Sequence, residues 1–343
     1  MSRNTSPDSG AHWTEPGAWP VAPGIHRIPL PLPMDGLQAI NVYVLETEEG
    51  LTLIDGGWAL EVSRAALIDA LQGIGKSLQD IRAFLVTHAH RDHYTQAVAL
   101  RAEVGAHVSL GAGERIALER MHEHAGGDSP FVPILRRAGA PDLAADWAAH
   151  RDPILPEHWE YPDTWLETDH RIRVGERELS AVSTPGHTRG HYVFADTDQS
   201  LLFAGDHVLP TITPSVGFEG VPGELPLAAF LSSLAKVRSL PDLRLLPAHG
   251  PVGMSSHARV DELLEHHDQR LDLCLRALGT GEQTAYQVAV QLPWTRQDRA
   301  LSELDPFNAG LATMETRVHL ELLVARGQVT VSEGDGQDVF RLT

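Results

Sequence analysis

Cysteine is nearly absent from this chain, which limits both its compartment and its chemistry. Cys274 is the only cysteine among 343 residues, so no internal disulfide can form, and nothing calls for an oxidising compartment. Its apolar neighbours, Leu271 to Leu275, predict a packed core thiol. No run approaches the roughly 20 apolar residues of a membrane span, and Met1 to Gly10 lacks the apolar segment of a secretory signal. These absences favour a soluble, cytoplasmic protein without a membrane partner.

Positive charge is also scarce. The chain has 27 Lys and Arg against 46 Asp and Glu, a formal net charge of −19. Nucleic acids and anionic membranes reward cationic surfaces, so the balance argues against both and favours a small-molecule substrate. The apolar content of 42% is that of an ordinary globular protein, and the length allows two domains.

Two common catalytic motifs are missing. There is no Gly-x-Ser-x-Gly elbow, and Gly111-Ala112-Gly113 lacks the third glycine of a dinucleotide loop. Histidine, in contrast, is plentiful, and the stretch Thr87 to His93 concentrates it in the order H-x-H-x-D-H. An apolar run, Ile81 to Val86, precedes this stretch and predicts a buried strand, and a helix is expected from Tyr94. Imidazole and carboxylate are ligands of zinc-type metals, so a metal site is favoured over a solvated histidine-rich loop.

Further ligand-type residues follow three later strands. His187 comes after the turn Pro185-Gly186, Asp206 follows Gly205, and His249 precedes Gly250. Glycine lets the backbone turn sharply or approach closely at such points. Each residue alone is more often structural, but together with the first cluster they form a converging set.

The expected elements divide the chain into three parts. Residues 1–20 form an irregular N-terminal arm, and residues 21–256 alternate short strands and helices as in an α/β domain. Within that domain, residues 113–168 form a helical insert whose large aromatics include Trp147, Trp159, Tyr161 and Trp165, and the insert is either a lid or pocket wall or a subdomain that only packs or dimerises. Residues 257–343 predict helices over 259–278, 285–292, 298–304 and 306–326 and then a hairpin, a winged-helix pattern. The apolar helix from Leu301 to Val324 favours a homodimer.

The motif order over residues 20–255 resembles the metallo-β-lactamase-fold hydrolase superfamily, and the C-terminal part resembles the winged-helix module of its lactamase-β-like-2 branch. The resemblance implies an αββα sandwich with two metal ions at one edge. It implies that one ion binds His88, His90 and His187, and that the other binds Asp92, His93 and His249. Asp206 would bridge the two ions, and Asp55 would orient ligands without binding metal. One departure from the family, Tyr94-Thr95 after Asp92-His93, puts the pocket shape in question.

The resemblance also implies a mechanism. A hydroxide that bridges two divalent ions would be the nucleophile, because such ions lower the pKa of water to about 7. Asp92 would serve as a ligand and as the proton acceptor. A set of only His and Asp suits zinc first, with iron or manganese as alternatives. Tyr94, Tyr161 and Tyr192 are candidate donors to the oxyanion or leaving group.

Three functions remain open on this evidence. The aromatic insert and the acidic surface favour hydrolysis of a small thioester, ester or lactone. The winged helix motivates a phosphodiesterase or ribonuclease, but residues 257–343 carry 14 acidic residues against 8 arginines, unlike a nucleic-acid reader. A metal-binding scaffold without turnover is the third. The missing thiolate ligand and export signal argue against an antibiotic-degrading lactamase.

The other histidines have no motif around them. His122, His124, His266 and His267 are expected on the surface of helices. His191 either faces the site or closes a turn, and His207 is expected to point away from the metals.

Overall fold

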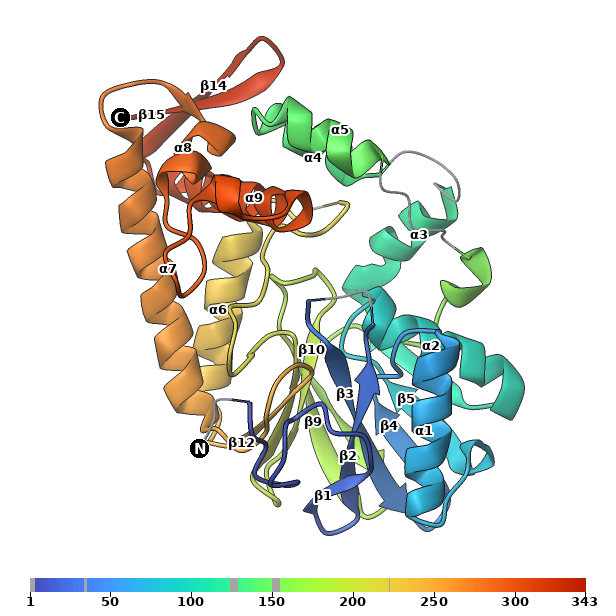
Figure 1. Cartoon of the computed structure of the whole chain (residues 1–343). Helices are drawn as coiled ribbons and strands as arrows, with labels where there is room; N and C mark the ends of the chain where they lie inside the picture. Colours follow the sequence, from blue (N-terminus) through green and yellow to red (C-terminus); the bar gives the residue numbers. More distant parts are fainter. Residues whose placement is uncertain (1–3, 34–35, 124–128, 150–154, 222) are drawn as a thin grey trace.

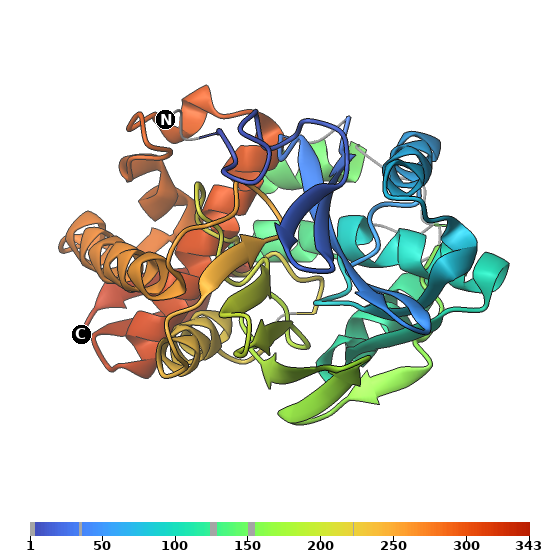
Figure 2. The same cartoon turned by 90° about the horizontal axis from the view of Figure 1, so that it is seen from below.

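The computed structural model describes residues 4–33, 36–123, 129–149, 155–221 and 223–343. Two β-sheets lie face to face between layers of helices (Figures 1 and 2). The first sheet has the strand order β1-β2-β3-β4-β5-β6-β7 and the second β12-β11-β10-β9-β8. This is the predicted αββα sandwich. Its strands are β1 (Trp19–Ala22), β2 (Ile25–Pro31), β3 (Ala39–Thr47), β4 (Gly50–Ile54), β5 (Ile81–Leu85), β6 (His107–Gly111), β7 (Thr164–Leu166), β8 (His170–Val174), β9 (Arg177–Ser183), β10 (Tyr192–Asp196), β11 (Leu201–Gly205) and β12 (Arg244–Pro247).

Apolar side chains fill each layer boundary. Tyr43, Phe194 and Phe203 belong to the cluster between the two sheets. A second cluster joins the outer face of the first sheet to helices α1 (Glu61–Gly73) and α2 (Arg91–Val104). A third joins the second sheet to α6 (Pro226–Arg238) and α7 (Ser256–Leu278). Strands β10 and β11 are buried along their whole length because helices cover one face and a sheet covers the other.

The sandwich brings several strand ends to one edge. β4 and β5 run parallel, as do β11 and β12, and parallel strands end at the same edge of a sheet. The histidine-rich stretch follows β5 there. Helix α2 begins at Arg91, three residues earlier than expected. Asp92 and His93 therefore lie in its first turn and not in the preceding loop.

The insert packs against the C-terminal part of the chain. Its helices are α3 (Arg115–Glu123), α4 (Phe131–Arg137) and α5 (Pro141–Ala149). Helices α4 and α5 lie beside α9 (Pro306–Ala325) in Figure 1, and Arg137 forms an ion pair with Asp338, 2.6 Å long. The tryptophans and the tyrosine of the insert lie in different places: Trp147 faces α9 through its hydrogen bond to Pro306, whereas Trp159 packs in the core of the first sheet. Tyr161 and Trp165 lie against each other, and Tyr161 is exposed.

The C-terminal part contains helices α7, α8 (Ala285–Gln291) and α9 and a small sheet of order β13-β15-β14. These are the elements of the predicted winged helix, and that assignment stays a prediction. The helix expected over 298–304 is wrong, because only a 3₁₀ turn, Leu301–Glu303, forms there. The strands of the sheet are β13 (Gln283–Thr284), β14 (Val329–Gly334) and β15 (Gln337–Leu342).

Helix α9 packs along most of its length against other parts of the chain. Eleven of its residues are buried, and it contacts α4 to α8 and β14. Most of this helix is therefore unavailable to a second chain, and the homodimer stays a prediction. Part of the N-terminal arm also packs on the body: Arg27 donates to Asp8 and to the Trp13 carbonyl. No helix among the described residues is both long and apolar enough to cross a membrane.

Candidate metal centre

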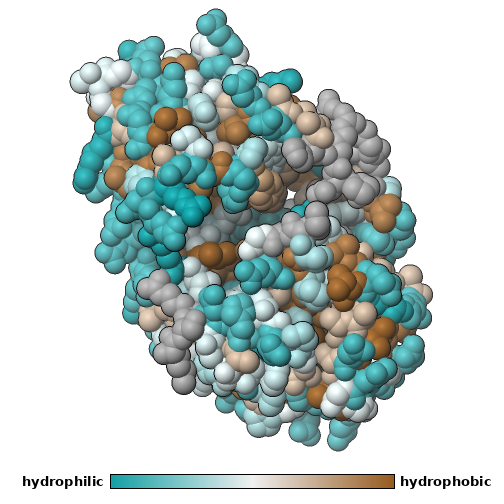
Figure 3. All heavy atoms as spheres, viewed as in Figure 1, coloured by the Kyte–Doolittle hydropathy of each residue, from teal (hydrophilic) through white to brown (hydrophobic). Residues whose placement is uncertain are grey.

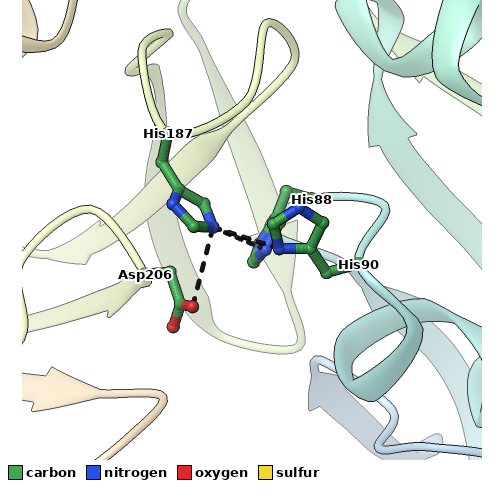
Figure 4. Close-up of side chains that lie close together, drawn as sticks. All are labelled: His88, His90, His187 and Asp206. Carbon is green, nitrogen blue, oxygen red and sulfur yellow. Dashed lines mark hydrogen bonds and ion pairs between the residues drawn. The ribbon is translucent and has the colours of Figure 1, made fainter. Parts of the chain in front are cut away.

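The seven predicted ligands meet at the edge of the sandwich, in two neighbouring groups. The first group is His88, His90, His187 and Asp206; the second is Asp92, His93 and His249. In each group, one nitrogen or oxygen from every member lies within 4.8 Å of the others. Figure 4 shows the first group: His88 and His90 come from the loop after β5, His187 from the loop between β9 and β10, and Asp206 from the end of β11.

Asp206 lies between the two groups. Its Oδ2 is 3.6 Å from His187 Nε2, and its Oδ1 is 3.4 Å from His249 Nε2. Gly205, with φ of +49°, lets the chain turn here, and a Cβ on it would lie 2.7 Å from His191 Nε2. His191 does not join either group. Its Nε2 accepts the backbone N–H of Asp206, and its Nδ1 lies 2.9 Å from Thr184 Oγ1, so it positions the turn that carries Asp206.

The outer ring nitrogens of the ligands are held by the protein. His93 Nδ1 donates to Asp55, His187 Nδ1 to the Ser215 carbonyl, and His249 Nδ1 to the Ala39 carbonyl, over 2.9, 2.7 and 2.7 Å. These bonds fix the tautomer that leaves Nε2 as a free electron-pair donor. Asp55 is held in turn by the N–H and hydroxyl of Thr87. Asp55 therefore has the geometry that the orienting role implied by the family resemblance requires.

The inner atoms lack partners of their own. Buried atoms without a hydrogen bond include His93 Nε2, His249 Nε2 and Asp206 Oδ1. His187 Nε2 lies only 3.2 Å from His88 Nε2 and 3.1 Å from His90 Nδ1. Unpaired buried polar atoms are costly, and several electron-pair donors pointing at one another need a cation between them. The donor set therefore fits divalent metal ions of the zinc type.

The electrostatics of the two groups differ. Burial lowers the pKa of His90 and of His187 to about 4, so both rings are neutral ligands at neutral pH. Burial opposes the charging of His93, but the carboxylates of Asp55, Asp92 and Asp206 raise its pKa to about 10. Burial would raise the pKa of Asp92, yet His93 and His249 hold it well below its usual range. In the second group, a protonated His93 thus lies beside an ionised Asp92. A cation that binds the group can displace the proton of His93.

Glu114 is a site-supporting residue that the sequence did not reveal. Its carboxylate accepts from the Thr188 hydroxyl and from the N–H of Gly190, 3.2 Å away, on the loop that carries His187. The backbone of Ala89, between His88 and His90, also bonds to it. Burial raises the pKa of Glu114 to about 7. No local signal marks it, because its partners lie 74 and 76 residues away in sequence.

Several expectations for other side chains are wrong. Tyr94 donates to the Glu160 carbonyl, and Tyr192 is buried in the cluster between the sheets. Tyr161, the third candidate donor, is exposed beside Trp165, and its role stays a prediction. His267 is buried on α7 against His319, and His266 is half-buried. The helical spacing of Leu263, His267, Leu271 and Cys274 was the signal for that burial.

The expectations for His207, His122 and Cys274 agree with the structure. His207 packs against Phe230 with ring centroids 5.0 Å apart, and it joins neither ligand group, as expected. His122 is exposed, as expected, and His124 lies outside the described residues. Cys274 is buried, as expected of a core thiol.

Comparison with known proteins gives consistent matches. Residues 35–249 match the family model described as metallo-beta-lactamase superfamily. The beta-lactamase-like protein 2 homolog of Caenorhabditis elegans is 26% identical over 78% of this chain and 77% of its own length. A hydroxyacylglutathione hydrolase of Fuscovulum blasticum is 30% identical over 53% of this chain and 52% of its own. The crystal structure of a metallo-beta-lactamase family protein from Thermus thermophilus has a TM-score of 0.78 at 26% identity, covering 94% of this chain and all of that one.

Proposed function

Because the chain belongs to the metallo-beta-lactamase superfamily and is a metal-dependent hydrolase of it, we propose that it uses two divalent ions, zinc in the first instance, to hydrolyse a small thioester, ester or lactone. The observation that carries the proposal is the pair of ligand groups that share Asp206. His88, His90 and His187 would hold one ion and Asp92, His93 and His249 the other. When bound, the ions supply a hydroxide at neutral pH and polarise the scissile carbonyl.

The residues of the chain have separate tasks in this proposal. His93 and His249 keep Asp92 ionised, so its carboxylate is available to accept a proton from the attacking water. Asp55, through the Nδ1 of His93, and the Ser215 and Ala39 carbonyls hold three rings in place. Holding the ligands in place before the substrate arrives limits the reorganisation needed during the reaction.

Four observations favour a carbonyl substrate over a phosphodiester. The net charge is −19, which repels a polyanion at long range. The C-terminal part is itself acidic, with 14 Asp and Glu against 8 Arg in residues 257–343. The ring of Phe218 lies 5.8 Å from that of His90, which places apolar surface beside the ligands. One relative is named for hydrolysing hydroxyacylglutathione.

The test is a substrate panel on zinc-loaded and chelator-treated protein, with His187→Ala as the inactive control. We expect hydrolysis of acyl-thioesters or lactones that requires metal and is lost in the variant. Cleavage of RNA or a phosphodiester without acyl hydrolysis would instead establish the phosphodiesterase alternative. Bound metal with no turnover on either class would establish the scaffold. Light scattering on dilute protein tests the proposed homodimer, and a monomer would refute it.

A further inference from the structure

Four aromatic side chains form a continuous surface that begins at a ligand of the candidate metal centre. Phe218 lies 5.8 Å from His90 between ring centroids, and the backbone of Phe218 bonds the His90 side chain. Phe131 stacks on Phe218 at 4.6 Å and 19°, and Phe307 meets Phe218 edge-on at 5.9 Å. Trp147 stacks on Phe307 at 5.2 Å and 11°. We name Phe131, Trp147, Phe218 and Phe307 the aromatic shelf.

The shelf is built from three distant segments, and close packing holds Trp147 in place. Phe131 and Trp147 come from α4 and α5 of the insert, Phe218 from the segment between β11 and α6, and Phe307 from the first turn of α9. Trp147 Nε1 donates to the Pro306 carbonyl at 3.0 Å. Its indole fits only because residue 310 is glycine, where a Cβ would lie 2.5 Å from Nε1. A fixed aromatic wall loses little conformational entropy when it binds a ligand.

Internal packing explains only part of this arrangement. Trp147 is 9% exposed, and its neighbours Val132, Leu135 and Met314 are buried, as in a small core. Phe307, however, is 47% exposed, and Phe131 and Phe218 are half-buried. Packing of a small core alone does not require a large aromatic ring that is as exposed as Phe307. Figure 3 shows the molecule hollowed between the part that contains α4, α5 and α9 and the sandwich below.

We propose that the aromatic shelf binds the apolar acyl part of the substrate, so that the enzyme selects long or bulky hydrocarbon acyl groups over acetyl. This inference rests on the proposed function, because it assigns the acyl group that is cleaved at the metal centre. The shelf starts at His90 and leads away from the ligands, so an acyl chain whose carbonyl is at the metals lies along it. Phe131, Phe218 and Phe307 offer apolar surface, supported from behind by the buried Trp147, and such surface binds hydrocarbon and discriminates weakly among its shapes.

The kinetic test compares acetyl, hexanoyl and decanoyl thioesters of N-acetylcysteamine. We expect the KM of the zinc-loaded protein to fall along this series. Phe307→Ser should raise the KM for the decanoyl thioester about tenfold, the size of a lost apolar contact in a binding pocket, and this penalty should shrink as the acyl chain shortens. Leu342→Ser removes another exposed apolar side chain, 40% exposed on β15 and outside the shelf, and is the matched control.

A binding measurement separates the shelf from the hydrolase proposal. The non-hydrolysable S-decyl thioether of N-acetylcysteamine is titrated calorimetrically into wild type, Phe307→Ser and Leu342→Ser, whose thermal unfolding is recorded alongside. Binding weakened about tenfold in Phe307→Ser alone supports the shelf, even if no thioester is hydrolysed. Hydrolysis with a KM independent of acyl length, or thioether binding equal in all three proteins, overturns the shelf and leaves the hydrolase proposal standing.

Discussion

Asp55→Asn tests the support beneath the second ligand group. Asp55 is 2% exposed and accepts from His93 Nδ1 at 2.9 Å and from the Thr87 N–H at 2.8 Å. Its φ of +62° lies in the left-handed region, where asparagine is one of the few residues tolerated. Asparagine therefore preserves the backbone turn that alanine would strain. It removes only the charge and one acceptor oxygen.

The expected consequence is a change at His93. If the amide oxygen of the substituted side chain still accepts from the Thr87 N–H, its NH₂ group faces His93 Nδ1. The His93 ring must then carry its proton on Nε2, the nitrogen that would otherwise bind the cation. Loss of such an orienting partner lowers metal affinity by about 10- to 100-fold, which corresponds to roughly 1.4 to 2.7 kcal/mol. The loss should fall on one of the two ions, because the His187 ring keeps its own bond to Ser215.

The assay is competition for zinc against a chromophoric chelator, with both equivalents resolved. Asp338→Asn is the matched control, because Asp338 is a buried carboxylate paired with Arg137 outside the ligand groups. It should bind zinc like the wild type. If Asp55→Asn also binds both equivalents with wild-type affinity, the orienting role of Asp55 is refuted.

Three further predictions concern the bridge, the loop and the buried acid. Asp206→Asn should lower the zinc content from about two equivalents to about one and reduce kcat at least about 100-fold, as checked by elemental analysis and turnover. Gly111→Ala should lower the free energy of unfolding by about 3 kcal/mol, because its Cβ would lie 1.8 Å from the Gly190 carbonyl oxygen on the His187 loop. Gly73→Ala, with nothing within 4 Å, is its control in urea unfolding. Glu114 has its pKa raised from 4.5 to about 7 by burial. Its contribution to stability is therefore complete below about pH 4.5 and lost as the pH rises through 7. Between these pH values, the free energy of unfolding of chelator-treated wild type should fall by roughly 3 kcal/mol relative to that of Glu114→Gln. Parallel pH profiles of the two proteins in urea unfolding would contradict this.

Much of the site was readable because its signals are local. Thr87 to His93 follows a strand that its own apolar residues specify, and the glycines beside His187, Asp206 and His249 mark turns at strand ends. Residue identity and short spacing carry this information, so the strands of the sandwich and the candidate ligands were predictable. The scarcity of cysteine and of positive charge was equally visible.

Other features depend on contacts between distant segments. Glu114 reaches the His187 loop across 74 residues, and the aromatic shelf joins positions 131, 147, 218 and 307, whose contacts no periodicity links. The expectation for Tyr94 was wrong because a partner elsewhere in the fold, the Glu160 carbonyl, accepts from its phenol.

Local sequence was therefore enough to identify the candidate cation ligands and the strands that carry them. Strand patterns and turn residues act over a few positions, where local sterics and burial dominate. Three-dimensional contacts were needed to show that Glu114 supports the His187 loop, that α9 is covered by its own chain, and that Phe218 lies beside His90. Those outcomes depend on how whole layers pack, and packing joins residues that no short-range rule connects.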